Sequence, residues 1–352
     1  LDSTSIACEM AHKEQTTDRF HSFSAVYAEE KFSERKYIEE TIRTTNFNPH
    51  WIVPTAQDIE KAFERVLYHQ ELPFRSMSIV MQALVMAEVR NNSSTVVLLE
   101  GQGSDEVFGG YTNQMLSFCT ELMRSLSPLK ALNEGLALIK NGSISWQQAY
   151  RSIVKLPIRS ALGMKERYVS RPYLSKSVRE PKSNPVSNNF FLADLFSTLT
   201  YRALPEYLRY SDRNSMTYSL ESRLPFLDFE LVEWAFTLPN EFKIKNGVGK
   251  MVLRDAMRKR IPAIVAQRRD KMGFTTPQAK WQKEKLIDWM APHLTADNLN
   301  ERFAFLDGKE ASLLVDEYKK GTMNDMGTIW RLFCLSAWHQ MWIENKGKRS
   351  SA

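Results

Sequence analysis

Residues 95–111 read TVVLLEGQGSDEVFGGY, and this stretch decides the class of fold. Its first half is a short β-branched and apolar run, which is typical of a parallel strand that is covered on both faces. Its second half is rich in glycine and acidic residues. In an open parallel sheet, ligands bind at the carboxyl ends of the strands. We therefore predict a buried parallel strand at 95–99 with a candidate ligand-binding turn directly after it.

Upstream of this stretch, strand and helix patterns alternate. Residues 20–27 have the pattern of a strand, and a short apolar piece follows at 51–53. Apolar side chains recur at helical spacing in 4–14, 58–70 and 78–90, and a charged helical stretch occupies 29–43. Strands that alternate with helices argue for an α/β fold with a doubly wound parallel sheet.

Downstream of Tyr111 the chain changes character. Residues 114–165 and 190–345 are expected to be mostly helical, with Trp and Met supplying bulk. Residues 166–190 are polar and rich in proline and serine, which predicts a loop. We expect an α/β core over 1–115, a mainly helical part over 116–345, and a disordered basic tail over 346–352.

Composition excludes several classes of protein. With 352 residues, of which 43% are hydrophobic and 25% charged, the chain can bury a sizeable core, so a collagen or a disordered chain is excluded. Its three cysteines are odd in number and far apart, which is neither a disulfide framework nor a zinc site and points to a reducing compartment. No apolar run approaches the roughly 20 residues that span a bilayer. We expect a cytoplasmic protein without a membrane segment.

The positive charge is concentrated in one window. Between Lys250 and Lys271 lie eight basic and two acidic residues, a surplus equal to the net charge of +6 of the whole chain. A focused basic patch suits one small polyanion better than a nucleic-acid duplex. A solvated helix face would have the same composition, and the pattern alone favours neither interpretation.

Three segments contain groups that could bind a phosphate. Glycines in the turn 101–103 let backbone N–H groups approach an anion, and Asp105 and Glu106 beside them are hard oxygen ligands suited to Mg²⁺. The hydroxyls of residues 1–5 open a helix, where phosphate can bind. Lys250 follows a Gly-rich turn and could meet a developing oxyanion. Each segment alone is better explained by ordinary capping or turn chemistry.

A further charged segment lies at 212–228. Its Glu221, Arg223 and Asp228 favour a structural ion-pair network, because charges near apolar residues must be paired. Arg213 in the same segment could instead reach a substrate.

Taken together, these segments resemble the synthetase domain of glutamine-hydrolysing asparagine synthetases. The motifs that carry the resemblance occur in the family's order over residues 1 to about 340. They are LDST (1–4), SDEVFGGY (104–111), SLESRLPFLD (219–228), LPNEFKIKNG with GKMVLRDAM (238–257) and RRDKMGFTTP (268–277). LDST resembles the second half of the family's pyrophosphatase loop, SGGxDS[ST], so we expect a piece of a longer or processed protein that lacks SGG and the first strand.

The resemblance implies a fold, a reaction and partners. The fold is the ATP pyrophosphatase (PP-loop) type, with extensive C-terminal helical additions. In the family, ATP and Mg²⁺ activate the side-chain carboxylate of aspartate as β-aspartyl-AMP with release of pyrophosphate, and ammonia then displaces AMP. The ammonia is derived from glutamine by an N-terminal glutaminase domain, which is absent here. Because SGG is also missing and the phosphate-binding loop is incomplete, we expect this chain alone to bind ATP weakly or not at all and to be inactive. From the resemblance we expect no nucleic-acid partner, and a homodimer remains an open alternative.

The resemblance also assigns residues, position by position. Asp2 and Asp105 match Mg²⁺ ligands, and Lys250 matches the lysine that stabilises charge at the α-phosphate. Arg213 matches a substrate arginine. The nucleotide-binding positions are Asp2, Ser3 and Thr4 of the pyrophosphate loop, Ser24 and Ala25 beside adenine, and Gly101, Gly103 and Ser104 of the glycine-rich turn.

One position departs from the family pattern. Many relatives have GEGSDE, whose first Glu is thought to orient or deprotonate ammonia, whereas this chain has Gln102, which cannot accept a proton at neutral pH. Gln102 therefore leaves open a related amidotransferase or amide-bond-forming enzyme that adenylates another carboxylate. A PP-loop protein that modifies tRNA is a further alternative, although it would need a wider basic surface. A non-catalytic fragment is the third.

Overall fold

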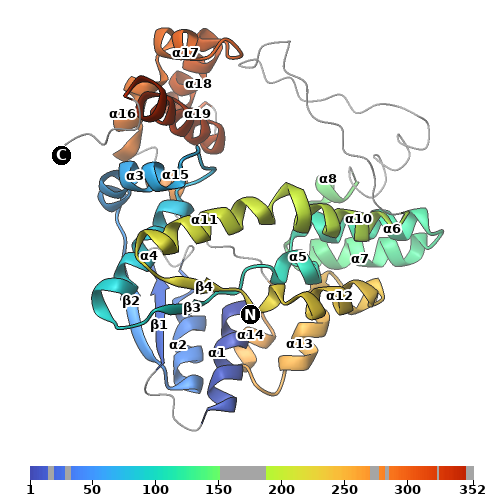
Figure 1. Ribbon diagram of the computed structural model, residues 1–352. Helices are drawn as coiled ribbons and strands as arrows, with labels where there is room; N and C mark the ends of the chain where they lie inside the picture. The colour runs from blue at the N-terminus through green and yellow to red at the C-terminus, as the bar shows by residue number, and fades with distance from the viewer. Residues whose placement is uncertain are drawn as a thin grey trace.

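The structure is a computed structural model, and it describes residues 1–14, 20–27, 33–150, 188–269, 277–281, 285–322 and 325–345. Within these residues the chain is mostly helical with six short strands, as expected for an α/β protein with large helical additions. Figure 1 shows β1 to β4 in the lower half of the molecule and the C-terminal helices above α3. The loop expected at 166–190, apart from its last three residues, and the tail expected at 346–352 lie outside the described residues.

The first hundred residues alternate helices and strands. These elements are α1 (Asp2–Lys13), β1 (His21–Ala25), α2 (Arg35–Thr45), β2 (Asn48–Ile52), α3 (Ala56–Gln70), α4 (Ser78–Asn92) and β3 (Val97–Leu99). The expected helices at 4–14, 58–70 and 78–90 are confirmed, as is the strand expected within 20–27. The charged helix expected at 29–43 is α2, which begins later, at Arg35.

Local sequence explains the start and the buried face of α3. Thr55 and Asp58 form a capping box in which the Asp58 N–H donates to the Thr55 hydroxyl and the Thr55 N–H donates to the Asp58 carboxylate. Ile59, Phe63 and Val66 then recur at helical spacing, and all three are buried. The periodicity thus selects the face that packs into the core.

The strands do not form the single doubly wound sheet that the alternation predicted. Among the described residues, β1 pairs in parallel with β2, and β3 pairs in parallel with β4 (Glu221–Arg223), as two separate two-stranded sheets. The third sheet is the antiparallel hairpin of β5 (Ile244–Lys245) and β6 (Val248–Gly249). Each strand has two to five residues and only one ladder partner, so the expected parallel pairing is present but the expected continuous sheet is not.

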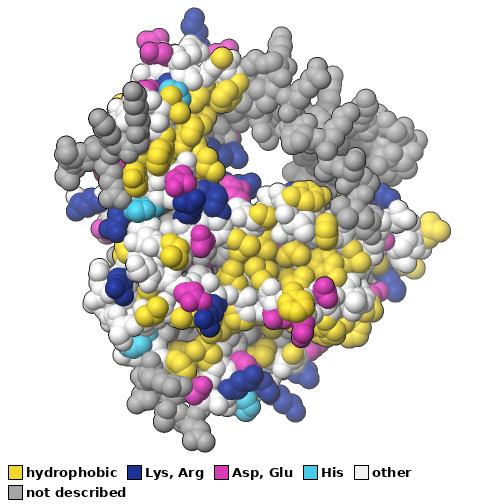
Figure 2. Space-filling view, viewed as in Figure 1, with side chains coloured by type: hydrophobic (Ala, Val, Ile, Leu, Met, Phe, Trp, Pro, Cys, Tyr) yellow, Lys and Arg dark blue, Asp and Glu magenta, His cyan; other side chains and the backbone are white. Residues whose placement is uncertain are grey.

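The prediction that 95–99 is a buried strand is also wrong in its burial. Val97 and Leu99 are each 39% exposed, because the described helices do not cover the face of β3 on which both lie. Figure 2 shows a broad apolar area on the viewed side, over β3, α5 and α12. A run of β-branched residues indicates a strand, but it does not indicate how many of its faces are covered.

The rest of the described chain is mainly helical, as expected. Its helices of seven or more residues are α6 (Thr112–Arg124), α7 (Pro128–Lys140), α10 (Phe190–Ser197), α11 (Leu204–Thr217), α12 (Phe229–Thr237), α13 (Met251–Met257), α17 (Ala296–Arg302), α18 (Gly308–Lys320) and α19 (Met326–His339). The shorter helices are α5 (Ser104–Phe108), α8 (Trp146–Ala149), α14 (Ala263–Ala266), α15 (Gln278–Trp281) and α16 (Ile287–Met290).

The largest hydrophobic core joins α3 and α4 to the C-terminal helices. Phe63 on α3 packs against Trp330 and Phe333 on α19, with ring centroids 5.7 and 4.7 Å apart. The same core includes buried residues of α4, α11, α16, α17 and α18. A separate core is formed by α6, α7 and α10 around Phe118 and Phe191. The first of these cores includes Tyr210 of α11, whereas Val107 and Phe108 of α5 are buried in a further core with Phe226 and Ala235. Figure 1 shows α5 and α11 in the middle of the molecule, where they carry or border the candidate site.

Candidate active site

The starts of three helices meet at one place in the fold. α1 begins at Asp2, α5 begins at Ser104 after the glycine-rich turn, and α13 begins after the β5–β6 hairpin. Gly101 permits this approach, because a Cβ atom there would lie 2.8 Å from the Cβ of Asp2 and 2.9 Å from the Ser3 nitrogen. Figure 1 shows the chain's N-terminus beside α5 and α14. Segments a hundred or more residues apart are therefore neighbours here.

Lys250 lies between the carboxylates of Asp2 and Asp105. Its Nζ is 2.6 Å from Asp2 Oδ2 and 2.7 Å from Asp105 Oδ1, and its side chain is 6% exposed. Burial by itself lowers the pKa of this ammonium, but the two carboxylates outweigh burial, so the pKa of Lys250 is raised. The lysine is therefore a fixed cation, and it is ion-paired with two groups that the sequence predicted as metal ligands.

The backbone around Lys250 is tightly constrained. Lys250 has a φ of +58°, in the left-handed region that a lysine rarely adopts, and its N–H donates to the Phe108 carbonyl at the end of α5. Gly110 follows α5, and a Cβ atom there would lie 1.8 Å from Asp105 Oδ1 and 2.3 Å from Lys250 Cε. The glycine at 110 is therefore required for the lysine to reach the carboxylate.

The donor set fits a divalent cation that is shared with a phosphate. Asp2 and Asp105 already lie close to one positive charge, and carboxylate oxygens are the ligands that Mg²⁺ prefers. No group of three or more His, Cys, Asp or Glu side chains gathers among the described residues. Two carboxylates without a third suit Mg²⁺, which is usually held by one or two carboxylates together with substrate phosphates and water.

The three hydroxyls predicted to bind the nucleotide in the pyrophosphate loop and the glycine-rich turn differ in their surroundings. Ser104 donates to Asp2 Oδ1 at 3.0 Å and is fully buried, so it orients that carboxylate. Ser3 in the first turn of α1 is exposed and open to a ligand. Thr4 is buried and its hydroxyl lies 3.2 Å from that of Thr41 on α2. Of these three hydroxyls, Ser3 has the position best suited to an incoming phosphate.

A buried carboxylate lies next to Asp105. Glu106 is 2% exposed, and the Tyr111 hydroxyl donates to its Oε1 at 2.7 Å. Burial raises the pKa of Glu106, and burial also raises the pKa of the Tyr111 hydroxyl. Glu106 was predicted to be an oxygen ligand, like Asp105, but one of its oxygens is already engaged by Tyr111, and it forms no ion pair with Lys250 among the described residues.

Gln102 belongs to a second polar cluster that is centred on Glu100. Glu100 accepts hydrogen bonds from the side chains of Gln82, Gln102, Ser211 and Ser222. The other atom of the Gln102 amide, Oε1, is buried and has no partner among the described residues. Glu100 was not predicted to take part in the site, although its place at the end of β3, directly before the turn, is the signal that could have found it.

Three predicted residues are not joined to the Lys250 cluster. Arg213 lies on α11, where its guanidinium pairs with Glu71 at 2.9 Å. Ser24 and Ala25 lie at the carboxyl end of β1 and pair with Trp51 and Ile52 of β2. Their predicted roles at substrate and adenine stay predictions.

The basic window is not a free patch. Lys250 pairs with Asp2 and Asp105, while Arg260 pairs with Glu9 and Arg268 with Glu34. All four acids come from segments outside the window, so a count along the sequence could not register them. Three basic residues of the window are thus ion-paired, and of these Lys250 lies in the site, while residues 270 and 271 lie outside the described residues.

The ion-pair network expected at 221–228 is smaller and more exposed than predicted. Arg223 Nε pairs with Glu221 at 2.7 Å, and both side chains are more than half exposed. Asp228 instead caps α12 by accepting hydrogen bonds from the N–H groups of Glu230 and Leu231. The apolar neighbours in sequence do not bury these charges.

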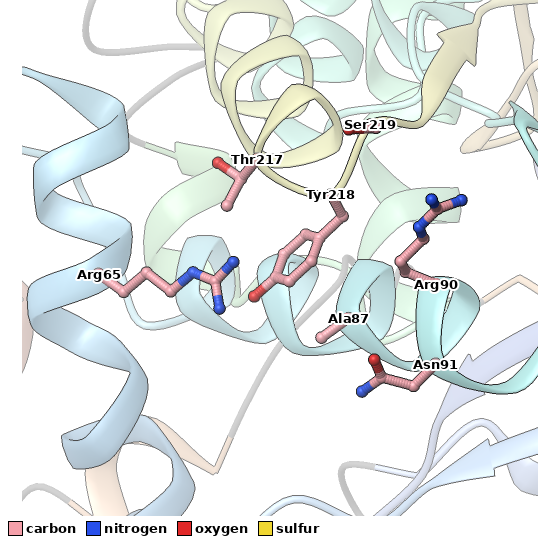
Figure 3. Close-up of a pocket in the computed structure, with 7 residues that line it drawn as sticks. All are labelled: Arg65, Ala87, Arg90, Asn91, Thr217, Tyr218 and Ser219. Atoms are coloured by element: carbon pink, nitrogen blue, oxygen red, sulfur yellow. The ribbon is translucent and has the colours of Figure 1, made fainter.

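A pocket of about 350 Å³ lies away from the Lys250 cluster, between α3, α4 and the end of α11. Figure 3 shows Arg65 and Arg90 on either side of Tyr218, with the Arg65 guanidinium toward the ring. The last turns of α4 and α11 both face this pocket, and helix C-termini favour cations over anions. Arg65 lies over the Tyr218 ring at 4.8 Å from its centroid, and Arg90 lies in the last turn of α4. Both arginines therefore have a structural explanation, and we assign no group of this pocket to the site.

Comparisons with known proteins agree with one another. The family model described as asparagine synthase matches residues 1–342. A Mycobacterium bovis protein named putative asparagine synthetase (glutamine-hydrolyzing) is 26% identical over 98% of this chain and 54% of its own length. Asparagine synthetase (glutamine-hydrolyzing) 1 of Bacillus subtilis is 24% identical over 92% of this chain and 52% of its own length. The chain thus spans about half the length of these curated relatives.

No helix among the described residues is both long and apolar enough to cross a bilayer.

Proposed function

The chain belongs to the asparagine synthase family, and we propose that the intact protein converts aspartate to asparagine with ATP. The side-chain carboxylate of aspartate attacks the α-phosphorus of ATP, pyrophosphate leaves, and β-aspartyl-AMP forms. Ammonia that a further domain releases from glutamine then attacks the acyl carbon, and AMP leaves. The single observation that carries the proposal is the pairing of buried Lys250 with Asp2 and Asp105 at the meeting point of three helix starts.

The charges of this cluster suit adenylation. Asp2 and Asp105 would hold Mg²⁺, which would neutralise phosphate oxygens when bound. Lys250 remains protonated because its pKa is raised, so it can stabilise the negative charge that grows as pyrophosphate leaves. Ser104 holds the Asp2 carboxylate in position.

We assign the remaining predicted residues by their places around this cluster. Ser3, Thr4, Gly101 and Gly103 would lie along the phosphates, with Ser3 exposed to them. Ser24 and Ala25 would contact adenine from the end of β1. Arg213 would have to leave its pair with Glu71 to reach a substrate carboxylate, which is feasible because both side chains are substantially exposed.

A second candidate function is kept because of the polar cluster at Gln102. An enzyme that adenylates a different carboxylate would share Asp2, Asp105 and Lys250 but would present other groups to its acceptor. The acceptor is thus the part of the proposal that must be tested directly.

The test is turnover by the intact protein with ATP, Mg²⁺, ammonium and aspartate. We expect AMP, pyrophosphate and asparagine to form together, and formation only with another acid from a panel of carboxylates would select the second candidate. Lys250→Met should abolish AMP release, whereas Lys245→Met, at the exposed lysine of the same hairpin, should not. Tight binding of tRNA in a filter assay, without turnover of any carboxylate, would contradict both candidates.

A further inference from the structure

Glu100 is saturated with hydrogen-bond donors. Its Oε1 accepts from the hydroxyls of Ser211 and Ser222 at 2.8 and 2.6 Å. Its Oε2 accepts from the amides of Gln82 and Gln102 at 3.3 and 3.0 Å. A carboxylate offers about four acceptor positions. All of them are in use, so Glu100 has no position left for a ligand unless one of these bonds is broken.

This arrangement fixes which way the Gln102 amide points. An ionised carboxylate only accepts hydrogen bonds, so the Gln102 atom beside it at 3.0 Å must be the Nε2 donor. Gln102 Oε1 is consequently directed away from Glu100. That oxygen is buried and has no donor among the described residues. A buried acceptor without a donor is costly, so this oxygen is suited to an N–H group that arrives with a ligand.

A chain of three side-chain amides, from Gln82, Asn214 and Gln70, ends at the Glu100 carboxylate. The Gln82 amide donates to Glu100 and accepts from the amide of Asn214 at 3.0 Å. The oxygen of Asn214 in turn accepts from Gln70 at 2.9 Å. These three side chains come from α4, α11 and α3, and each amide donates toward the carboxylate. Because an acceptor-only group stands at one end, none of the three amides can flip alone.

We propose that Glu100 is a positioning residue that turns Gln102 Oε1 toward the nitrogen nucleophile. The inference rests on the proposed function, and it concerns the second step alone. Ammonia attacks the acyl carbon of the adenylate through its lone pair, and the bond to the AMP oxygen breaks. Gln102 Oε1 accepts one N–H of the ammonia, which directs the lone pair at that carbon. The proton lost from nitrogen goes to solvent, since an amide oxygen does not take it up at neutral pH.

The readout is the number of AMP molecules released for each asparagine formed. When the nucleophile is poorly oriented, water attacks the adenylate, and AMP forms while aspartate is regenerated. A purely structural defect would reduce AMP and asparagine together and leave this ratio unchanged. The assay uses the intact protein with saturating ATP and aspartate and a range of ammonium concentrations, so that the KM for ammonium is obtained from the same data.

Two substitutions at Glu100 separate positioning from proton transfer. Glu100→Gln can still accept from both amides and can donate to both serine hydroxyls, so we expect the ratio to stay within about 3-fold of the native value. Glu100→Leu releases Gln102, and we expect a rise of about 10-fold or more, because small misplacements of reacting groups are costly. Asp307→Asn, the same change of carboxylate to amide at the cap of α18, is the matched control.

A third substitution guards against misfolding of Glu100→Leu. Gln102→Leu removes the acceptor but leaves Glu100 its other three partners, and it should raise the ratio equally. An unchanged ratio in both leucine variants would overturn the inference, as would a Glu100→Gln variant as impaired as Glu100→Leu. A higher KM for aspartate at an unchanged ratio would also overturn it, since Oε1 would then hold the amine of aspartate. Native protein that releases no aspartate-dependent AMP would instead contradict the proposed function itself, and the inference with it.

An exchange of the two residues provides the sharpest test. Gln102→Glu would place two carboxylates about 3 Å apart, which cannot both be ionised, so the pair would share a proton. We therefore expect this variant to release more AMP for each asparagine than the native protein. The double variant Glu100→Gln with Gln102→Glu restores one donor and one acceptor, and we expect its ratio to return toward the native value. The inference would be overturned if the single Gln102→Glu variant had a ratio of AMP to asparagine as low as that of the double variant.

Discussion

Two buried lysines stand on either side of the β5–β6 hairpin, and they differ in almost everything except burial. Lys243 directly precedes β5, is 0% exposed, and donates its Nζ to the Leu238 carbonyl at 2.9 Å. Burial lowers its pKa to about 8. Lys250 directly follows β6 and is 5% exposed, yet its pKa is raised because Asp2 and Asp105 outweigh burial. Lys243, whose pKa is lowered to about 8, and Lys250, whose pKa is raised, are therefore only seven positions apart in the sequence.

The comparison shows that burial alone does not decide the charge of a lysine. A carbonyl satisfies one donor but supplies no net charge, so Lys243 bears most of the cost of desolvation. Two carboxylates compensate Lys250, and the cost is moved to the mutual repulsion of Asp2 and Asp105. The lysine with charged partners is the one suited to act on a phosphate.

The largest effect is expected when Lys250, the lysine with two carboxylate partners, loses its charge. Lys250→Met leaves the Asp2 and Asp105 carboxylates facing each other without their cation. We expect aspartate-dependent AMP release to fall by about 1,000-fold or more, because a preorganised cation at the developing charge is lost. Measured with Lys245→Met as the control, an AMP rate within 10-fold of native would remove Lys250 from the mechanism.

Asp105→Asn weakens the same cluster without removing the lysine. Lys250 then retains one ionised partner, and the site loses one oxygen charge for Mg²⁺. We expect AMP release to fall by about 100-fold and the Mg²⁺ concentration for half-maximal activity to rise, as measured by titration of the rate with MgCl₂. A Mg²⁺ dependence equal to that of the native protein would indicate that Asp105 serves only to pair Lys250.

Lys243→Met tests the uncompensated lysine, and its effect is on stability. The folded protein releases the Lys243 proton near pH 8, whereas the unfolded chain keeps it to about pH 10.5. Between these values the unfolded state binds more protons, so stability rises with pH in the native protein, and below pH 8 the full cost remains. We expect Lys243→Met to raise the free energy of unfolding at pH 7 by about 1–3 kcal/mol.

The measurement for Lys243 is urea unfolding at several pH values from 7 to 10.5. The gain from Lys243→Met should be largest at pH 7 and should shrink as the pH approaches 10.5. Lys245→Met, two residues away and exposed, should leave the pH dependence of the native protein intact. Lower stability of Lys243→Met at pH 7 would mean that its bond to Leu238 outweighs desolvation.

The smallest expected effect comes from an exposed pair of the same length. Arg223 and Glu221 are 2.7 Å apart, as close as Lys250 and Asp105, but both side chains lie in solvent. We expect Arg223→Ala to change the free energy of unfolding by about 0.5 kcal/mol or less, because exposed ion pairs contribute little. A loss above 2 kcal/mol in urea unfolding would show that distance rather than burial sets the strength of these pairs.

The sequence predicted the elements of the fold better than their assembly. Periodicity located α3 and α4, and the capping box at Thr55 explains why the first of them begins where it does. The parallel character of β3 was also predicted correctly. Its exposure was not, because the cover of a strand depends on elements far away in the sequence. For the same reason one continuous sheet was expected where two separate parallel pairs are described.

The candidate site was likewise predicted only in part. The resemblance to the family assigned Asp2, Asp105 and Lys250, and the structure brings all three side chains together. The polar cluster at Glu100 was not predicted, since three of its four hydrogen-bond partners come from other segments that no local pattern connects. Likewise the acids that neutralise Arg260 and Arg268 lie more than 200 residues away.

The hydrogen bond between Glu100 and Gln102 also constrains the order in which substitutions can accumulate. A change of residue 102 to Glu while residue 100 is still Glu would bring two negative charges to within about 3 Å of each other. A lineage that exchanges the amide for a carboxylate must therefore neutralise position 100 first. The two positions are expected to vary together among descendants of this sequence, with Glu at one of them and a neutral residue at the other.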